Sequence, residues 1–533
     1  MFVQQQHAHF IGIGGIGMSG IAEILLSMGT HVSGSDQRRS AITDRLAALG
    51  ATVFEGHRSE NIAGATVVVT SSAIRPDNPE VMEARQRKIP VIQRAEMLAE
   101  LMRLKYGIAI AGMHGKTTTT SMVASVLSAG GLDPTVVVGG RVDALGSNAR
   151  LGSTQYLVAE ADESDRSFLK LSPILAVITN LDREHMDCYH DMADVESAFL
   201  AFMDKVPFYG AITACVDNPA LAAILPRAHR RVFTYGLDRS ADYRLELLPS
   251  PRSFSKQITA GPLTRSVDET ALTTHEATRL THEAASLADE SAMPADEATP
   301  ASAPASASPT VLGASESPLV STPIAYSRFQ IWTDTGLLGP FELHVPGHHN
   351  VLNATAAIAI AHQLSVAPEK IVEGIANFRG VDRRFQYRGS ARGIAVIDDY
   401  GHHPTEIRAT LAAALECGHK RIHVLFQPHR YSRTLDLLEQ FEGAFQVADS
   451  LTLLPIYAAS ETPIPGVTAK MLAERMRTGG QAPPVTLVED FPSAVAQMVA
   501  QAEPGDLILT LGAGNVSQLA PLILKALEQS VIA

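Results

Sequence analysis

The sequence has little cysteine and no long apolar run. Its three cysteines, Cys188, Cys215 and Cys417, are far apart and odd in number, a pattern that forms neither a disulfide framework nor a paired metal-ligand motif. A reducing, cytoplasmic environment is therefore expected. No apolar run reaches the ~18 residues that a membrane helix needs, and the N-terminal MFVQQQHAHF lacks the basic segment of a signal peptide. We expect neither export nor insertion into a membrane.

An excess of basic residues is also missing. The formal net charge is −13, and no concentrated basic face is visible in the sequence, which argues against a general nucleic-acid binder. Any bound phosphates should then belong to small molecules. A chain of 533 residues is long enough for roughly three domains with hydrophobic cores of their own.

The first domain is expected over residues 1–105. HAHFIGIGGIGMSGIAEILLSMG predicts a strand, a glycine turn and an amphipathic helix, and THVSGSD predicts a second strand. The β-rich runs ATVFEG, ATVVVTSSAI and IPVIQRAEML continue the pattern. This succession is typical of a Rossmann-like α/β domain with a parallel sheet.

Two more α/β domains follow, over residues 106–378 and 379–533. The central one begins with the strand, loop and helix of YGIAIAGMHGKTTTTSMVASVLSAGG, and its runs YLVAE and ILAVIT are apolar throughout, as in strands buried on both faces of a parallel sheet. Residues 250–325 within it are rich in Ala, Ser, Thr, Pro and Glu, which predicts a disordered insertion; a small helical subdomain is the alternative. The last domain repeats the α/β pattern with GIAVIDDY, RIHVLFQP, SLTLLPIY and DLILTLGAG.

GIGGIG, from Gly12 to Gly17, matches the glycine fingerprint of dinucleotide-binding folds. It follows a predicted strand, opens a helix, and precedes Asp36 by the ~20 residues expected of that fingerprint. On its own it favours a nicotinamide or flavin site over a merely tight turn. Physically it requires only a diphosphate at a helix N-terminus, so any nucleotide diphosphate satisfies it.

AGMHGKTTTTSM is a phosphate-loop motif with shortened spacing. The usual pattern would place a glycine at position 110, but that residue is Ile110 and the nearest glycine is Gly112. Gly115, Lys116 and Thr117 nevertheless supply what an ATP loop needs, which is close backbone approach, a cation for the phosphates and a hydroxyl for Mg²⁺. The alternative is a threonine-capped helix that carries Gly-Lys-Thr by chance.

Acidic residues follow two of the predicted central strands. Glu160 ends VAE, and Asp182, Glu184, His185 and Asp187 follow ITN in the stretch LDREHMD. The carboxyl ends of parallel strands meet at one edge of a sheet, so these groups should converge near the phosphate loop as in a Mg²⁺-nucleotide site. A single acidic run of this kind is more often a solvated loop or a helix cap, but here several features coincide.

Taken together, these motifs resemble the Mur ligase family over nearly the whole chain outside residues 250–325. The resemblance rests on GIGGIGMSGIA, AGMHGKTTTTSM, NARLGS, VAEADESDRSFL, TNLDREHMD, PGHHNVLNATAA, GVDRRFQ, DDYGHHPTE, QPHRYSRT and GAGN, all in family order. The family's phosphate loop has the same shortened spacing. The resemblance implies an ATP-dependent ligase that joins L-alanine to the lactyl carboxylate of UDP-N-acetylmuramate through an acyl phosphate and a tetrahedral intermediate, with release of ADP and phosphate.

The resemblance also implies which residues form the nucleotide sites. The expected UDP-sugar site consists of Gly12, Gly14, Gly15, Gly17, Ser35, Asp36, Ser71, Asn148 and Arg150. The expected ATP site consists of Gly112, Met113, His114, Gly115, Lys116, Thr117, Thr118, Asn350, Asn353, Arg384 and Asp399. Asn350 and Asn353, one helical turn apart, would face adenine; a capping pair at a helix start is their alternative.

Catalysis, metal binding and amino-acid binding are implied in the same way. The catalytic set is expected to be Lys116, Glu160, His185 and Arg384, and the Mg²⁺ ligands Thr117, Glu160 and His185. The amino-acid site is expected to contain Tyr400, His402, His429, Arg430 and Arg433. An arginine fork binds two carboxylate oxygens at once. Expected partners are UDP-N-acetylmuramate, ATP and L-alanine, with no nucleic acid and no membrane, in a monomer or homodimer.

Three alternatives remain open at this point. A nicotinamide-dependent oxidoreductase would use Gly12, Gly14, Gly17 and Asp36, but this alternative gives Lys116 no role. A regulator that binds ATP without turnover is a second alternative, and a sister ligase that adds another amino acid or a peptide, such as the murein-peptide recycling ligase, is a third. Arg183, in the stretch LDREHMD, departs from the family pattern by adding a positive charge beside the expected metal site.

Overall fold

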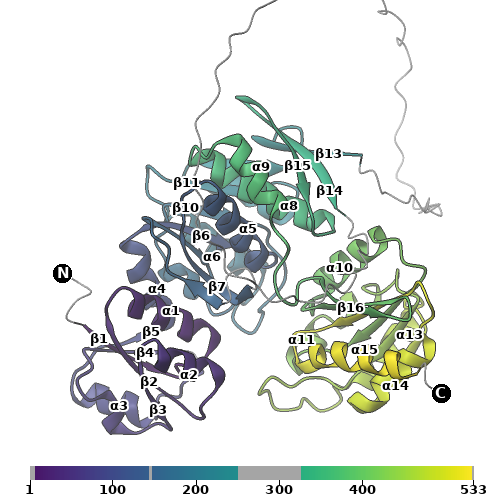
Figure 1. Ribbon diagram of the computed structural model, residues 1–533, viewed down its shortest axis with the longest axis horizontal. Helices are drawn as coiled ribbons and strands as arrows, with labels where there is room; N and C mark the ends of the chain where they lie inside the picture. The colour runs from purple at the N-terminus through teal and green to yellow at the C-terminus, as the bar shows by residue number, and fades with distance from the viewer. Residues whose placement is uncertain (1–5, 72, 143–146, 250–325, 531–533) are drawn as a thin grey trace, which may run out of the picture. The chain divides into compact units, whose positions relative to one another are not determined.

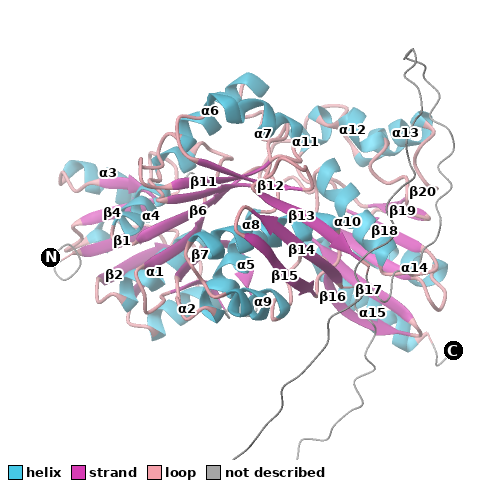
Figure 2. Ribbon diagram, turned by 90° about the horizontal axis from the view of Figure 1, so that it is seen from above, coloured by secondary structure: helices cyan, strands magenta, loops and turns pink. Residues whose placement is uncertain are grey.

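The computed structural model describes residues 6–71, 73–142, 147–249 and 326–530. Their strands form three sheets, of five, ten and six strands, with helices packed on them (Figures 1 and 2). The predicted α/β class with three sheets is confirmed. The predicted insertion at 250–325 lies outside the described residues.

The N-terminal sheet is parallel throughout, with strand order β3-β2-β1-β4-β5. Its strands are β1 (His7–Ile11), β2 (His31–Asp36), β3 (Thr52–Glu55), β4 (Val67–Thr70) and β5 (Val91–Gln93). Its helices are α1 (Ile16–Ser27), α2 (Ala41–Ala48), the short η1 (Ser59–Ile62), α3 (Pro79–Gln86) and α4 (Arg94–Arg103). β1 lies at the centre of the sheet, so the glycine turn that follows it opens at the middle of the carboxyl edge.

The prediction that IPVIQRAEML is β-rich was wrong over its second half. β5 is only three residues long, and α4 begins directly after Gln93. The backbone N–H of Gln93 donates to Glu96 Oε2 at 2.7 Å, which closes a capping box at the start of the helix. Met97, Leu98 and Leu101 are buried at helical spacing, so helix packing decides the conformation here.

The central sheet has the order β15-β14-β13-β12-β11-β10-β6-β9-β7-β8. It is parallel from β13 to β7 and antiparallel at both edges, where β14 and β15 are added next to β13 and β8 is added next to β7. Its strands are β6 (Tyr106–Ala111), β7 (Thr135–Val142), β8 (Ser147–Arg150), β9 (Tyr156–Glu160), β10 (Leu175–Ile178), β11 (Ala211–Cys215), β12 (Val232–Gly236), β13 (Tyr243–Leu248), β14 (Ser327–Thr333) and β15 (Gly336–Leu343). Its helices are α5 (Lys116–Ala129), η3 (Ser167–Lys170), α6 (Met192–Met203), α7 (Pro219–Ile224), η4 (Leu225–Arg227), α8 (His348–Gln363) and α9 (Pro368–Ala376).

The C-terminal sheet has the order β16-β17-β21-β18-β19-β20, in which β16 alone is antiparallel to its neighbour. Its strands are β16 (Gln386–Ala391), β17 (Ile394–Asp399), β18 (Ile422–Phe426), β19 (Ser450–Leu453), β20 (Val485–Leu487) and β21 (Leu507–Leu511). Its helices are α10 (Pro404–Glu416), α11 (Tyr431–Asp436), α12 (Leu438–Glu442), α13 (Ala469–Gly479), α14 (Phe491–Gln501), η5 (Asn515–Gln518) and α15 (Leu519–Gln529).

Four apolar clusters form the core of the described residues. The largest combines side chains of the N-terminal and central sheets, from Ala8 to Val381, and a small one lies between β1, β4 and α3. Two further clusters lie on opposite faces of the C-terminal sheet. Alternate residues of one strand, such as Val424 and Leu425, belong to different clusters, as the period of two in a β-strand requires.

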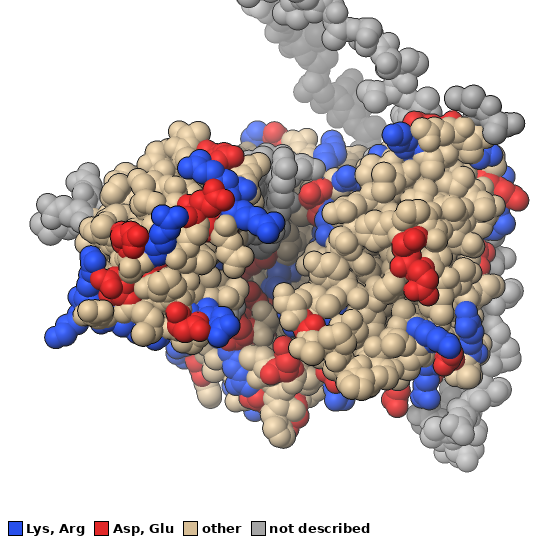
Figure 3. All heavy atoms as spheres, turned by 90° about the horizontal axis from the view of Figure 1, so that it is seen from below, with Lys and Arg blue, Asp and Glu red and all other residues tan. Residues whose placement is uncertain are grey.

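Charged residues of both signs are interspersed on the surface. On the face drawn in Figure 3, the described Lys and Arg side chains alternate with Asp and Glu and with wide areas of other residues. Within the ranges that the structure describes, no helix is long and apolar enough to cross a membrane.

Candidate active site

The phosphate loop joins β6 to α5 at the carboxyl edge of the central sheet. Gly112 has φ +127°, and a Cβ added there would lie 2.0 Å from Thr179 Oγ1, so no side chain fits. Gly115, with φ +84°, immediately precedes the first residue of α5, and no side chain caps the helix start. The uncapped N–H groups and the helix dipole make this turn suitable for an anion.

The end of β10 holds the loop in place. The His114 N–H donates to Asn180 Oδ1 at 2.9 Å, and Asn180 Nδ2 donates back to the His114 carbonyl at 3.0 Å. The Thr179 hydroxyl donates to the same carbonyl at 2.6 Å. The loop is thus fixed before any ligand enters, which reduces the ordering cost of binding.

The Lys116 ammonium is folded back against its own loop. Its Nζ donates to the carbonyls of Gly112 and Met113, at 2.8 and 3.0 Å, and lies 2.7 Å from Glu163 Oε1. Burial acts to lower the pKa of Lys116, but the paired Glu163 carboxylate outweighs burial and raises the pKa above its usual range. Lys116 is therefore a permanent cation at neutral pH.

The expected metal-binding residues come from three segments next to the phosphate loop, with Glu160 opposite Ile110 in the strand before it. Thr117 is the second residue of α5, Glu160 ends β9, and His185 follows β10 on the loop that begins at Asn180. His185 has φ +57°, in the left-handed region, a strained conformation for a non-glycine residue that is frequent at functional sites. Its Nε2 lies 3.5 Å from Glu163 Oε1, which links the histidine to the lysine through one carboxylate.

His114 is the centre of an ionic cluster. Its Nε2 lies 2.8 Å from Asp182 Oδ2, and its Nδ1 lies 3.4 Å from Glu406 Oε1 and 3.6 Å from Glu184 Oε2. Burial disfavours the charged ring, but the hydrogen bonds to Asp182 and Glu406 raise the pKa of His114 to about 10. Ligand atoms of His114, Asp182 and His403 lie within 4.8 Å of one another, but a protonated imidazole offers no lone pair to a metal.

A cavity of about 280 Å³ opens beside the loop. Predicted ATP-site residues on its wall are His114, Gly115, Thr118, Asn350, Asn353, Arg384 and Asp399. Gly112, Met113, Lys116 and Thr117 do not line it and lie at the phosphate-loop side. Asn350 Nδ2 donates to the Pro346 carbonyl at 2.7 Å, so that amide also secures the start of α8, as the capping alternative suggested.

Arg384 and Asp399 enter the cavity wall from the C-terminal sheet. Arg384 lies over the Tyr400 ring, 5.0 Å from its centroid, and 3.7 Å from Glu406 Oε1. Asp399 accepts backbone N–H bonds from Phe385 and Gly401, both at 2.7 Å, and burial raises its pKa. Its oxygens therefore organise the C-terminal loop, while the Arg384 guanidinium is the group with donors to offer a phosphate.

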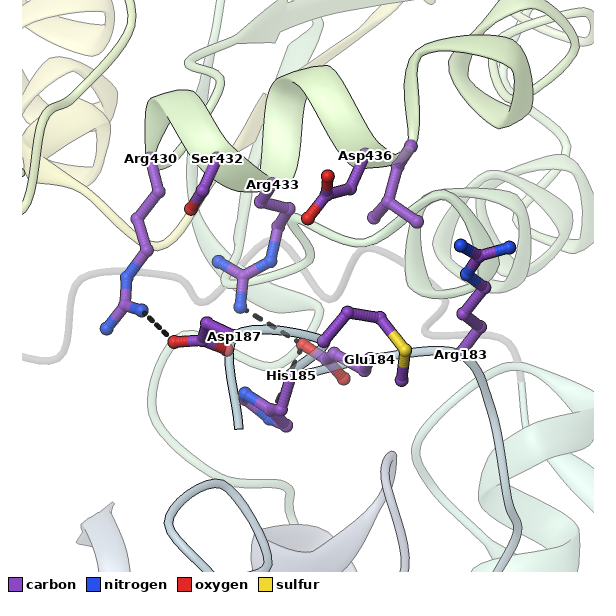
Figure 4. Close-up of a pocket in the computed structure, with 10 residues that line it drawn as sticks. Arg183, Glu184, His185, Asp187, Arg430, Ser432, Arg433 and Asp436 are labelled. Atoms are coloured by element: carbon purple, nitrogen blue, oxygen red, sulfur yellow. Dashed lines mark hydrogen bonds and ion pairs between the residues drawn. The ribbon is translucent and has the colours of Figure 1, made fainter. Parts of the chain in front are cut away.

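The expected amino-acid residues cluster on one side of the His185 loop. Figure 4 shows Arg430 directed at Asp187 and Arg433 directed at Glu184, with ion-pair distances of 3.5 and 3.2 Å. His429 Nδ1 lies 3.1 Å from Arg433 Nη1, and burial lowers the pKa of His429 to about 3, so its neutral ring can accept from the guanidinium. His402 Nε2 lies 3.6 Å from Glu184 Oε1, and its Nδ1 lies 3.1 Å from the Tyr400 carbonyl.

The glycine turn of the N-terminal sheet has the geometry of a diphosphate site. The N–H groups of Gly12 and Ile13 donate to the Ser35 carbonyl, and the Gly14 N–H donates to Asp36 Oδ2 at 2.8 Å. Gly15 precedes the first residue of α1 without a side-chain cap. A Cβ added at Gly17 would lie 2.7 Å from Arg94 Nη1, so a guanidinium that sequence reasoning missed lies against this helix start.

The other expected UDP-sugar residues are more dispersed. The Ser35 hydroxyl is buried and donates to Glu80 Oε2 at 2.6 Å, so it supports the sheet interior. Ser71 directly follows β4. Arg150 ends β8, against which α1 packs, and pairs with Asp133 at 2.8 Å. Asn148 lies on β8, but its side chain is outside the described part of the structure.

Three family models match the chain. The Mur ligase family catalytic domain matches residues 7–106, the Mur ligase middle domain matches residues 110–277, and the Mur ligase glutamate ligase domain matches residues 383–514. Together they match residues of all three sheets, with β14 and β15 of the central sheet outside the matched ranges.

Full-length relatives carry the name of one ligase. The UDP-N-acetylmuramate–L-alanine ligase of Acidobacterium capsulatum is 58% identical over 528 residues, which cover 99% of each chain. The protein of the same name from Koribacter versatilis is 55% identical over 534 residues, which cover 100% of each chain. A crystal structure of UDP-N-acetylmuramate–alanine ligase from Thermotoga maritima is similar with a TM-score of 0.70 at 27% identity, covering 98% of this chain and 99% of its own.

Proposed function

The chain belongs to the Mur ligase family, and we propose that it joins L-alanine to UDP-N-acetylmuramate with conversion of ATP to ADP and phosphate. The resemblance stated from the motifs is confirmed by the family models and the full-length relatives. The observation that supports the chemistry best is Lys116, a half-buried cation in a short phosphate loop, whose ammonium is paired with the buried Glu163 just after β9.

In the first step a carboxylate oxygen of UDP-N-acetylmuramate attacks the γ-phosphorus of ATP. A P–O bond forms to the sugar acid, the bond to the ADP oxygen breaks, and an acyl phosphate results. Lys116 and the N–H groups at the start of α5 bind the phosphates, and Arg384 supplies donors from the wall of the adjacent cavity. No protein nucleophile takes part, so positioning and charge neutralisation carry catalysis.

In the second step the amine of L-alanine attacks the acyl carbonyl. A tetrahedral intermediate forms, inorganic phosphate leaves with the C–O bonding pair, and the amine loses a proton. Arg430 and Arg433 are the candidates for the alanine carboxylate, since a guanidinium binds both oxygens in one plane. The ion pairs with Asp187 and Glu184 keep both arginines on the same side of the His185 loop.

Mg²⁺ is the cofactor that this donor set fits. Thr117, Glu160 and His185 would hold it, and the hydroxyl and carboxylate oxygens are of the type that Mg²⁺ prefers. When bound, the ion would neutralise charge on the transferred phosphoryl group.

The diphosphate of the sugar nucleotide is assigned to the glycine turn at α1, with Arg94 as an additional cation. Cytoplasmic location and a monomeric or dimeric state stay predictions.

Phosphate release tests the proposal. Purified protein is mixed with UDP-N-acetylmuramate, ATP and Mg²⁺, and each single amino acid is added in turn. Release should depend on L-alanine. Release that is independent of the amino acid, or that requires a peptide, would instead support another ligase. NADH binding that UDP does not compete would support the oxidoreductase alternative.

A further inference from the structure

The buried carboxylate of Glu163 occupies the position of an anion in the phosphate loop. Its side chain is 1% exposed, and its Oε1 lies 2.7 Å from the ammonium of Lys116. The two loop carbonyls of Gly112 and Met113 take the other donors of that ammonium. An ammonium has three N–H donors, so none remains for a phosphate while this arrangement persists.

Lys116 is the partner that has to move when a nucleotide enters. The backbone of Glu163 is anchored, because its carbonyl accepts from the Tyr189 hydroxyl at 2.7 Å and from the Arg166 N–H at 3.0 Å. The lysine instead has a long flexible stem that can extend toward the loop opening. When Lys116 moves away, the Glu163 carboxylate stays buried, and His185 Nε2 lies 3.5 Å from its Oε1 atom.

We propose that Glu163 is a positioning residue, an internal counter-ion of Lys116 that the phosphates of ATP displace and that reclaims the lysine when ADP leaves. This inference rests on the proposed ATP site. The carboxylate competes with the nucleotide for one cation and also repels its phosphates at short range. Glu163 therefore keeps nucleotide binding weaker than the loop alone would make it, and favours release of the product.

Calorimetric titration with ADP and with a non-hydrolysable ATP analogue, in the presence of a chelator, tests this role. Glu163→Gln keeps an oxygen beside Lys116 but removes the charge. A hydrogen bond to a charged group is worth enough that we expect the Kd of both nucleotides to fall roughly tenfold. Asp165→Asn is the matched control, with the same charge change two residues away on an exposed side chain, and should leave the Kd unchanged.

A double-mutant cycle separates the lysine's role from a general charge effect. In a Lys116→Met background, Glu163→Gln should change the Kd far less than in the parent, because the pair no longer exists. Unchanged or weaker nucleotide binding by Glu163→Gln would overturn the inference, as would an equal gain in Asp165→Asn or in the Lys116→Met background.

A second variant keeps the test decisive if Glu163→Gln fails to fold. Glu163→Asp retains the charge but withdraws it by one methylene, so the Kd should fall by a smaller factor in the same direction; an unchanged or larger Kd contradicts the inference. Failure of the parent protein to bind either nucleotide would refute the ATP site itself, whereas nucleotide binding that ignores Glu163 refutes only the role proposed for this residue.

Discussion

Arg433 Nη2 lies 3.2 Å from Glu184 Oε1, which joins α11 to the residue directly before His185. A protein carboxylate thus occupies one edge of the guanidinium that we assign to the carboxylate of L-alanine. Recognition of the amino acid should depend on the planar fork of this arginine and not on its charge alone. Arg433 is accordingly the residue at which selectivity for the amino acid is best tested.

Arg433→Lys should raise the KM for L-alanine about tenfold, because a lysine cannot hold two oxygens in one plane. The KM for ATP should change little. Initial rates of phosphate release at varied alanine concentration give both values. Arg477→Lys, on the exposed side of α13, is the control, and an equal rise of the KM in that variant would contradict the assignment.

Lys116→Ala should reduce turnover by about 10²- to 10³-fold or more, since it removes the main cation at the transferred phosphoryl group. Binding of UDP-N-acetylmuramate should stay nearly intact because the glycine turn at α1 belongs to another sheet. Turnover is measured by phosphate release and binding by calorimetry. A joint loss of both would show that the two sites are not separate.

Gly115→Ala should weaken ATP binding while Gly131→Ala does not. Both glycines have positive φ, +84° and +76°, so both substitutions carry a similar backbone strain of about 1 kcal/mol. A Cβ at position 115 would also lie 2.7 Å from Asn353 Oδ1, whereas a Cβ at position 131 meets nothing within 4 Å.

The comparison of these two variants isolates the contact at the cavity wall. Thermal unfolding should show similar small losses of stability, and only Gly115→Ala should raise the KM for ATP. An equal KM for ATP in both variants would show that Asn353 does not belong to the nucleotide site.

The stability of the protein should fall as the pH rises from about 6.5 to about 10. Burial opposes the charge on His114, but Asp182 and Glu406 raise its pKa to about 10, above the ~6.5 of an unfolded histidine. A group whose folded pKa is raised contributes stability that is complete below the unfolded pKa and disappears as the pH passes the folded pKa. The contribution of one such proton is at most about 1.4 kcal/mol per pH unit.

The contribution of His114 to this pH-dependent loss of stability is measured by comparing the parent protein with His114→Gln. Asp182, Glu184, Glu406 and His403 surround the ring, and the variant should be less stable at pH 6.5 but show a flatter loss toward pH 10. Denaturant unfolding at several pH values measures both slopes. Parallel curves for the two proteins would refute a charged His114.

The phosphate loop is recognisable in the sequence because glycine, lysine and threonine stand together at a predicted strand-to-helix turn, in a domain whose strands end in acidic residues. Sequence reasoning could not choose Glu163, because Asp162, Glu163 and Asp165 look alike in ADESD. Only the turn after β9 decides which of them turns inward: Glu163 is buried, whereas Asp162 pairs with Arg94 and Asp165 is exposed. Arg94 was missed for a similar reason, since IPVIQRAEML was interpreted as a strand.

Replacement of residues 250–325 by a short glycine-serine loop should leave turnover unchanged. β13 and β14 are antiparallel neighbours, with Leu248 opposite Arg328, so the chain leaves and re-enters the sheet at adjacent positions. Closing a loop costs only ~0.6 kcal/mol for each doubling of its length, and the unfolding midpoint should therefore stay equal or rise slightly. Loss of turnover in a folded variant would show that this segment contributes to the activity.

The apolar clusters of the described residues divide near position 382, with one set ending at Val381 and the others beginning beyond it. The links across this division are polar, such as the Thr405 hydroxyl that donates to Asp182 at 2.7 Å and the Arg433–Glu184 pair. The side chains of Arg433 and Glu184 are only 12% and 6% exposed, and salt screens buried charge pairs much less than exposed ones. These polar links should therefore persist at ionic strengths that abolish ion pairs on the open surface.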